Sequence, residues 1–191
     1  MTATEDLRAE HEGILRMLAI LEAVAGRLRD GKDVPAAHLA GMLDFLKVFA
    51  DKCHHGKEED ILFPALEAAG LARDSGPIGV MLREHTLGRG HIRAMGVALE
   101  LMEPGGGQAS AERAQVESFC AEASAYVELL TQHIAKENTV LFPMAERLLG
   151  APALTDMHEA FERLEEERIG PGRHEAFHRL LNDLATEYLA A

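Results

Sequence analysis

Residues 54–64 read HHGKEEDILFP, and residues 133–143 read HIAKENTVLFP. Both stretches follow the pattern H-x-x-K-E-x-x-x-L-F-P, which places a histidine four residues before a glutamate, as His54 and Glu58 show in the first copy. Residues four apart lie on the same face of a helix. The internal repeat therefore predicts two helices that each present an imidazole and a carboxylate side by side.

A Glu-His pair lies upstream of each copy, and its histidines are His11 and His85. Each half of the chain then contains a helix with a histidine near its start, a turn, and a helix with the repeat near its end. The turn DGKDVP lies about 20 residues from both His11 and His54, so at ~1.5 Å per residue these histidines stand at one height in an antiparallel pair. We expect the second half to follow the same plan, so that four histidines and two glutamates meet at one level.

Apolar residues recur at spacings of three, four and seven and predict long helices separated by Gly- and Pro-containing breaks. The expected helices cover approximately residues 4–29, 35–70, 78–102 and 110–149. No strand-like alternation competes with them. The predicted fold class is all-α, an up-and-down antiparallel four-helix bundle. Its metal-binding domain spans residues 1–150, and residues 151–191 form a C-terminal helical extension packed on or beside the bundle.

Charge and composition exclude several classes of function. The 191 residues carry a formal net charge of −13, which disfavours binding to nucleic acid and to anionic membranes. There is no apolar run of about 18 residues and no apolar leader at the acidic start, so we expect a cytoplasmic protein. Cys53 and Cys120 form no C-x-x-C pair and are expected to be buried thiols.

A single histidine on an apolar stripe is more often a hydrogen-bonded core residue than a ligand. Six imidazoles and carboxylates at one buried level could not satisfy one another, because an unpaired buried carboxylate costs several kcal/mol. A metal removes that cost. Imidazole and carboxylate together suit iron, manganese or zinc, and two carboxylates with four histidines suit a pair of metals. The predicted metal ligands are His11, His54, Glu58, His85, His133 and Glu137.

The order and spacing of these residues over approximately residues 5–149 resemble the haemerythrin HHE cation-binding family. The resemblance implies a centre of two non-haem iron ions (Fe2+/Fe3+) with an oxo or hydroxo bridge, in which Glu58 and Glu137 bridge and the histidines are terminal. Manganese or zinc are possible substitutes. Oxygen carriers of the family have a further histidine four residues after the one on the third helix, where this chain has Arg89. The set therefore resembles the iron-centre repair type more than the carrier type.

Four further residues are candidates for the surroundings of the centre. His55 and Glu59 repeat the spacing of four, but at about 100° per residue they should lie at the rim or behind the ligands. Arg89 is expected to form a salt bridge, or else to bind an anion at the mouth of the site. Tyr126 either packs in the core or donates a hydrogen bond towards the centre.

The C-terminal extension has ligand-like spacings of its own. They involve His158, His174 and His178, which we expect at the surface or an interface, with a second metal site as the alternative. A protein partner or a homodimer could be contacted through residues 151–191.

Two classes of function remain open. In the first, the centre handles a small diatomic or peroxide ligand, by binding or reducing O2, NO or H2O2 or by repairing iron centres, and the protein is a possible di-iron oxidoreductase. In the second, the protein is a non-catalytic oxygen or iron sensor or a storage module that signals through its C-terminal helices. A purely structural zinc site is a weaker third reading, because structural zinc normally takes four ligands.

Overall fold

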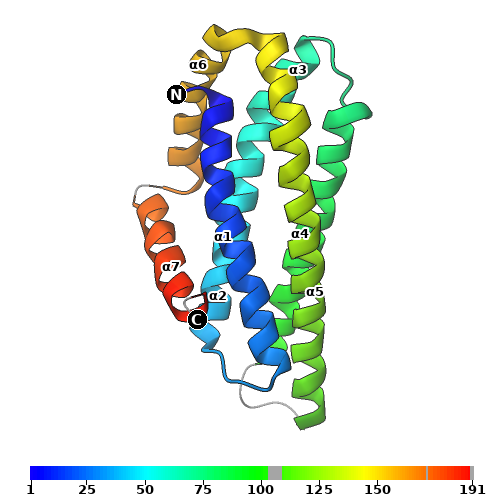
Figure 1. The fold of residues 1–191 in the computed structure, drawn as a ribbon, viewed down its shortest axis with the longest axis vertical. Helices are drawn as coiled ribbons and strands as arrows, with labels where there is room; N and C mark the ends of the chain where they lie inside the picture. The colour runs from blue at the N-terminus through cyan, green and yellow to red at the C-terminus, as the bar shows by residue number, and fades with distance from the viewer. Residues whose placement is uncertain (103–108, 171, 190–191) are drawn as a thin grey trace.

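A computed structural model describes residues 1–102, 109–170 and 172–189, and within these ranges it contains helices and no strand. Four long helical segments run up and down beside one another, and the end of the chain packs against one side (Figure 1). The all-α bundle predicted from the sequence is confirmed. The elements are α1 (Ala3–Arg29), α2 (Ala36–Asp44), η1 (Phe45–His55), η2 (Glu58–Leu62), α3 (Phe63–Ala68), α4 (Gly76–Leu101), α5 (Ala109–Lys136), η3 (Glu137–Leu141), α6 (Phe142–Arg168) and α7 (Arg173–Tyr188).

The segments η1, η2 and η3 are π-helical, and they carry the repeated motif. In a π-helix the N–H group bonds to the carbonyl five residues back, and such segments occur frequently at functional sites. The Phe63 N–H donates to the Glu58 carbonyl, and the Phe142 N–H donates to the Glu137 carbonyl. The same change of helical register therefore follows the glutamate of both copies.

Proline ordinarily disfavours a helix interior, yet helical structure continues through both Leu-Phe-Pro triplets of the repeat. Pro64 and Pro143 each lie in the first turn of an α-helix that continues the π-segment before it. Where a helix returns from the wider π pattern to the α pattern, one backbone carbonyl is left over. A proline at that point removes an N–H group without costing a hydrogen bond, so the usual penalty of an interior proline is avoided.

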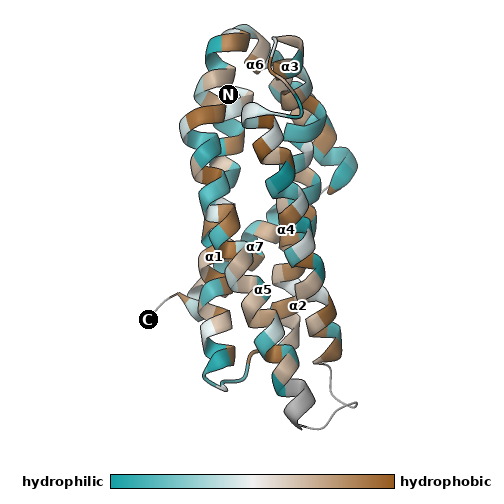
Figure 2. Cartoon of the chain, turned by 90° about the vertical axis from the view of Figure 1, so that its right-hand side faces the viewer, coloured by the Kyte–Doolittle hydropathy of each residue, from teal (hydrophilic) through white to brown (hydrophobic). Residues whose placement is uncertain are grey.

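The buried apolar residues form two clusters, one on each side of the level of the histidines. The smaller cluster contains Leu7, Phe63 and Phe142, and the larger one contains Ile14, Phe49 and Tyr126. Figure 2 shows hydrophilic and hydrophobic residues interspersed along each long helix, as amphipathic helices of a bundle require. The polar layer between the clusters is held in place by packing above and below it.

The chain turns at Gly150, whose φ of 76° suits glycine, and then runs back along the bundle. The second half of α6 and α7 pack against α1 (Figure 1). In α7 the ring of Phe177 lies 5.6 Å from that of Phe45 in η1, so the extension shares the larger core cluster. The division at residue 150 stays a prediction. Among the described residues, no helix is long and apolar enough to cross a membrane.

Candidate metal centre

The polar layer brings together two groups of buried side chains from four helical segments. Within each group, one potential ligand atom per residue lies within 4.8 Å of the others. We call them group A and group B. Group A consists of His11, His54, Glu58 and Glu137, and group B consists of His55, His85, His133 and Glu58.

The histidines approach one another through their Nε2 atoms. The Nε2 atoms of His11 and His54 are 3.0 Å apart, and those of His85 and His133 are 3.1 Å apart. Two ligand atoms that each lie about 2.1 Å from a metal, at a right angle, are separated by about 3.0 Å. The spacing of each pair therefore matches two neighbouring positions in the coordination sphere of one metal.

The glutamates lie between the two groups. Glu137 Oε2 is 3.2 Å from His11 Nε2, while its Oε1 is 3.0 Å from His133 Nε2. Glu58 Oε2 is 3.4 Å from His85 Nε2 and 4.0 Å from His54 Nε2. Each carboxylate thus faces histidines of both groups, which is the position a bridging ligand needs.

The Nδ1 atom of every one of these histidines faces an oxygen acceptor. The pairs are His11 with Asn138 at 3.0 Å, His54 with Glu10 at 2.7 Å, His55 with Asp51 at 3.4 Å, His85 with Glu59 at 2.6 Å and His133 with Glu84 at 2.9 Å. An ionised carboxylate only accepts hydrogen bonds, so the proton of the neutral ring lies on Nδ1. Nε2 then carries a free lone pair, and an oxygen behind the ring fixes its orientation, as behind metal-binding histidines.

The residues fit a metal, because the lone pairs of the histidine Nε2 atoms and of the Glu58 and Glu137 carboxylates point towards one another inside the layer. None of the four carboxylate oxygens of Glu58 and Glu137 has a hydrogen-bond partner, although both residues are fully buried. Leaving such groups unpaired costs several kcal/mol. Cations between the Nε2 atoms and the carboxylates would satisfy all of them at once.

The sequence pattern described as Hemerythrin HHE cation binding domain matches residues 2–145. The chain belongs to this family. The uncharacterized protein Rv1995 of Mycobacterium tuberculosis (strain ATCC 25618 / H37Rv) is 29% identical over 170 residues, 89% of this chain and 64% of that protein. The iron-sulfur cluster repair protein YtfE of Edwardsiella ictaluri (strain 93-146) is 33% identical over 135 residues, 71% of this chain and 59% of that protein.

The chain spans less than two thirds of the length of both relatives. No solved structure matches it. The haemerythrin HHE family is thus shown by its sequence pattern, and the geometry of the centre is described from this chain alone.

Burial controls the protonation of this haemerythrin-like centre. It lowers the pKa of His54 and of His55 well below the ordinary value of an imidazole, and nearby histidines lower both further. Burial raises the pKa of Glu58, and the charge of Glu137 raises it more. For His133, burial alone would lower the pKa, but the Glu137 carboxylate outweighs it and raises the pKa to about 9. A metal would therefore displace a proton from His133.

The lysine of the repeat has a role that the sequence analysis missed. Lys57 Nζ donates to Glu10 at 2.6 Å, and Lys136 donates to Glu84. These two glutamates are the same ones that accept from His54 and His133. The signal was visible, because both the lysine and the Glu-His pair occur twice in the sequence.

The sequence analysis also gave too little weight to the position after each glutamate of the repeat, Glu59 and Asn138. Glu59 accepts from His85, and Asn138, at the matching position of the second copy, accepts from His11. The expectation that Glu59 lies behind the ligands agrees with this contact. Each half of the repeat therefore supplies the acceptor for the first histidine of the other half.

The structure shows the surroundings of three other candidate residues, Arg89, Tyr126 and His55. Arg89 forms the expected salt bridges, with Nε 2.7 Å from Asp51 and Nη2 2.8 Å from Glu59. Tyr126 is fully buried in the larger core cluster, and its hydroxyl has no hydrogen-bond partner in the described structure. His55 was expected at the rim or behind the ligands, and the structure places it in group B, only 2% exposed.

A third cluster of potential ligands is already satisfied by an ammonium group. Glu10, Cys53 and Glu165 lie close together, and Lys57 Nζ is 2.6 Å from Glu10 and 3.1 Å from Glu165. Lys57 also lies 3.1 Å from Asp6, so three carboxylates surround it. Burial alone would lower the pKa of Lys57, but Glu10 and Asp6 outweigh it and raise the pKa. We call Lys57 with Asp6, Glu10 and Glu165 the Lys57 network.

The histidines of the extension do not form a separate group of metal ligands among the described residues. His174 and His178 have ring centroids 4.7 Å apart, and His158 lies 3.8 Å from both Asp6 and Glu162. His174 instead bonds to Glu165. Their expected place at the surface or at an interface stays a prediction.

The Glu165–His174 pair gives a pH-dependent prediction. The hydrogen bond of 2.5 Å between them raises the pKa of His174 and lowers that of Glu165 to about 2. A histidine with a raised folded-state pKa stabilises the fold below its unfolded pKa, and the contribution is lost as pH rises through the folded pKa. We expect His174→Ala to lower the free energy of unfolding more at about pH 6 than at about pH 9, with a difference below about 1 kcal/mol. Urea titration at both pH values measures it.

An equal loss at the two pH values would contradict this prediction. It would mean that the substitution removed only the packing of the His174 ring against Phe49, whose centroid is 5.6 Å away.

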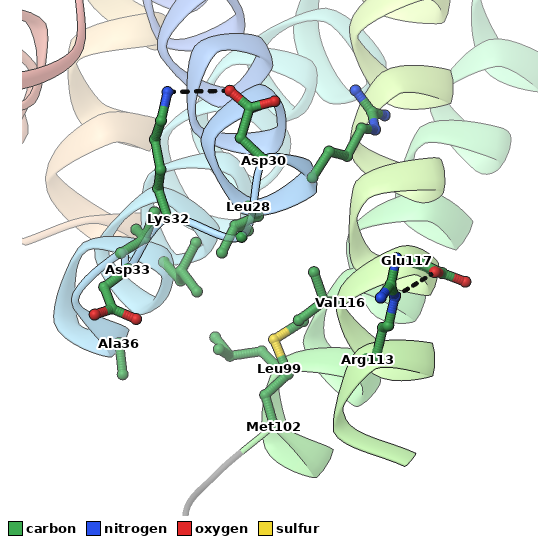
Figure 3. A pocket seen from close by; sticks show the side chains of 14 residues that line it. Leu28, Asp30, Lys32, Asp33, Ala36, Leu99, Met102, Arg113, Val116 and Glu117 are labelled. Atoms are coloured by element: carbon green, nitrogen blue, oxygen red, sulfur yellow. Dashed lines mark hydrogen bonds and ion pairs between the residues drawn. The ribbon is translucent and has the colours of Figure 1, made fainter. Parts of the chain in front are cut away.

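One surface hollow lies far from the centre. Its lining is formed by the loop after α1 and by the facing ends of α4 and α5, and includes Leu28, Leu99 and Val116 (Figure 3). Leu28 is roughly 25 Å along α1 from His11. The lining offers apolar side chains and two ion pairs but no imidazole, so we assign it no part in the chemistry of the centre.

Proposed function

We propose that the protein holds two non-haem iron ions in groups A and B and uses them to bind or reduce a small ligand such as O2, NO or H2O2. The proposed ligands from the two halves are His11, His54, Glu58, His85, His133 and Glu137. The observation that carries the proposal is Glu137, whose two oxygens face histidines of different groups at 3.2 and 3.0 Å. A single metal would not need a carboxylate that faces both ways.

The donor set supports iron over the alternatives. Imidazole and carboxylate donors suit iron, manganese and zinc, but zinc sites of structural type are normally tetrahedral and closed by four ligands. The relative YtfE is described as an iron-sulfur cluster repair protein, which also favours iron. Two iron ions bound here would supply two electrons on oxidation from Fe2+ to Fe3+.

The protein's own side chains would set the chemistry in three ways. The carboxylates of Glu58 and Glu137 balance the positive charge of the metals. The acceptors behind the rings hold each Nε2 towards the centre. The six ligands are at most 1% exposed, so packing excludes bulk water and bulky substrates and leaves only small ligands able to enter.

A sensor that signals through the C-terminal helices is the second candidate, and the Lys57 network favours it. Glu10 accepts from His54 and from Lys57, and Lys57 reaches Glu165 in α6. A shift of His54 on metal or ligand binding would therefore act on one of the contacts between the bundle and α6.

Elemental analysis and turnover test the proposal together. After anaerobic reconstitution with Fe2+, we expect two irons per chain, because the two groups share Glu58 and because Glu137 faces histidines of both. With a reductant present, the reduced protein should consume many equivalents of NO or H2O2. One tightly held metal, or none, would contradict the di-iron centre, while two irons with only stoichiometric oxidation would favour the sensor.

A further inference from the structure

The Nε2 atom of His55 is a buried polar atom with no hydrogen-bond partner in the described structure. It belongs to group B, where ligand atoms of Glu58, His85 and His133 lie within 4.8 Å. Its Nδ1 faces Asp51 Oδ1 at 3.4 Å, as the Nδ1 atoms of the other four histidines face an oxygen. Like the other four histidines, His55 thus has an acceptor behind its Nδ1, and its own Nε2 has no hydrogen-bond partner among the described residues.

The π-helical register explains how two consecutive residues reach the same layer. His54 and His55 are the last residues of η1, where hydrogen bonds span five residues. A wider turn rotates the chain by less than the 100° per residue of an α-helix. His54 and His55 are therefore closer together around the helix axis than in an α-helix, and His54 belongs to group A while His55 belongs to group B.

The second half of the repeat lacks this imidazole. Position 134, which follows His133 as His55 follows His54, is the buried isoleucine Ile134. The two halves otherwise match in their histidines, bridging glutamates and lysines. The centre is consequently asymmetric, with two imidazoles in group A and three in group B.

Arg89, which lies in α4, holds the carboxylates behind His55 and His85 in place. Its guanidinium bonds to Asp51 and to Glu59, which are the acceptors behind His55 and His85. One planar cation therefore fixes both carboxylates, a task that suits the fork geometry of arginine. Arg89 acts on the centre through these carboxylates and does not itself join the group.

The ring of His55 is stacked on that of His85, with centroids 3.9 Å apart and planes 16° apart. Two stacked rings cannot both aim an in-plane lone pair at one atom, so His55 must turn about its side-chain bonds when a metal enters group B. The single long contact with Asp51 permits this turn, whereas His85 is held by a 2.6 Å bond.

We propose that His55 is the third imidazole ligand of the metal in group B. It stands beside His85 and His133, while His11 and His54 hold the metal in group A and both metals share Glu58 and Glu137. The metal in group A has fewer protein ligands, so the open position for a small ligand lies on the side of His11 and His54. This inference rests on the proposed di-iron function.

Anaerobic equilibrium dialysis with Fe2+ tests the role of His55, using His55→Phe and His55→Glu. Phenylalanine keeps the stacked ring but offers no lone pair, so we expect one iron to bind as in the wild type and the second on the order of 100-fold more weakly. Glutamate supplies an oxygen ligand at the same position and should restore much of the second affinity. His91→Ala, which removes an imidazole that bonds to Glu122 outside the layer, is the control.

X-ray absorption spectra provide a second readout, because imidazole scattering should fall in His55→Phe relative to the wild type. If His55→Phe binds both irons with wild-type affinity while the wild type binds two, His55 is only a packing residue and this inference fails. If the wild type itself does not bind two irons, the proposed function fails. A loss of both irons in a His55→Phe protein with wild-type circular dichroism would contradict the assignment of His55 to one metal.

Discussion

Glu58→Gln is expected to abolish tight binding of both irons and, at the same time, to stabilise the metal-depleted protein. Glu58 belongs to both groups, and its buried oxygens have no hydrogen-bond partner among the described residues. An amide keeps the shape but loses the charge, so it is a poor bridging ligand. The metal-depleted fold, in contrast, no longer buries a carboxylate beside Glu137.

The expected size of each effect follows from these two roles. We expect the iron content to fall from two to below one per chain after dialysis, because one lost bridge weakens both sites. The free energy of unfolding of the metal-depleted protein should rise by about 1–3 kcal/mol, which is the usual cost of an unsatisfied buried polar group. Elemental analysis and urea titration, with and without Fe2+ under anaerobic conditions, measure the two effects.

Glu162→Gln is the matched control, since the side chain of Glu162 is 69% exposed in α6. It should change neither iron content nor stability. If Glu58→Gln keeps both irons, Glu58 does not bridge. If it binds none but leaves the metal-depleted protein unchanged in stability, the carboxylate is satisfied in solution by water or a proton.

The spacing of residues was sufficient to predict the bundle and the convergence of six side chains. The argument from helix rise needs only the number of residues between each histidine and the nearest turn, so it does not depend on details of the helices. The geometry brings His11, His54, His85 and His133 together with both glutamates, as expected. Their role as metal ligands stays a prediction.

The expectation for His55 rested on α-helical geometry throughout its helix. His55 was placed about 100° away from the ligands, although η1 is π-helical and brings it into group B. A histidine pair directly before a register change cannot be interpreted from α-helical periodicity, because the hydrogen-bonding pattern depends on the packing of the whole layer.

The lysine of the repeat was missed for a different reason. Lysine is almost never fully buried unless it is paired, but the repeat itself does not show that Lys57 is buried. The partner glutamate lies one residue before His11, on another helix, and no local pattern connects it with Lys57. Only the antiparallel arrangement of α1 beside η1 and η2 brings the two residues into contact.

Lys57→Met is expected to have the largest effect on stability of the substitutions considered. Lys57 is 1% exposed, and its removal leaves the buried carboxylate of Glu10 without a cation. Breaking a buried ion pair by removing one partner costs about 3–5 kcal/mol. Urea titration of the metal-depleted protein measures this loss, and Lys52→Met, at an exposed position one turn earlier, is the control.

The same substitution should also weaken one metal site selectively. Glu10 accepts from His54 in group A, whereas Glu84 and Glu59 serve His133 and His85 in group B. Loss of an acceptor behind a metal ligand typically lowers metal affinity by about 10–100-fold, so one iron should bind more weakly and the other as before.

The double variant Lys57→Met/Glu10→Gln separates the two consequences of the substitution. It removes the unpaired charge, and the amide oxygen still accepts from His54, so much of the stability and of the iron affinity should return. A Lys57→Met protein within about 1 kcal/mol of the wild type would mean that water replaces the ammonium group. The Lys57 network would then be a solvated surface feature, and the route from the centre to α6 that favours a sensor would lose its physical basis.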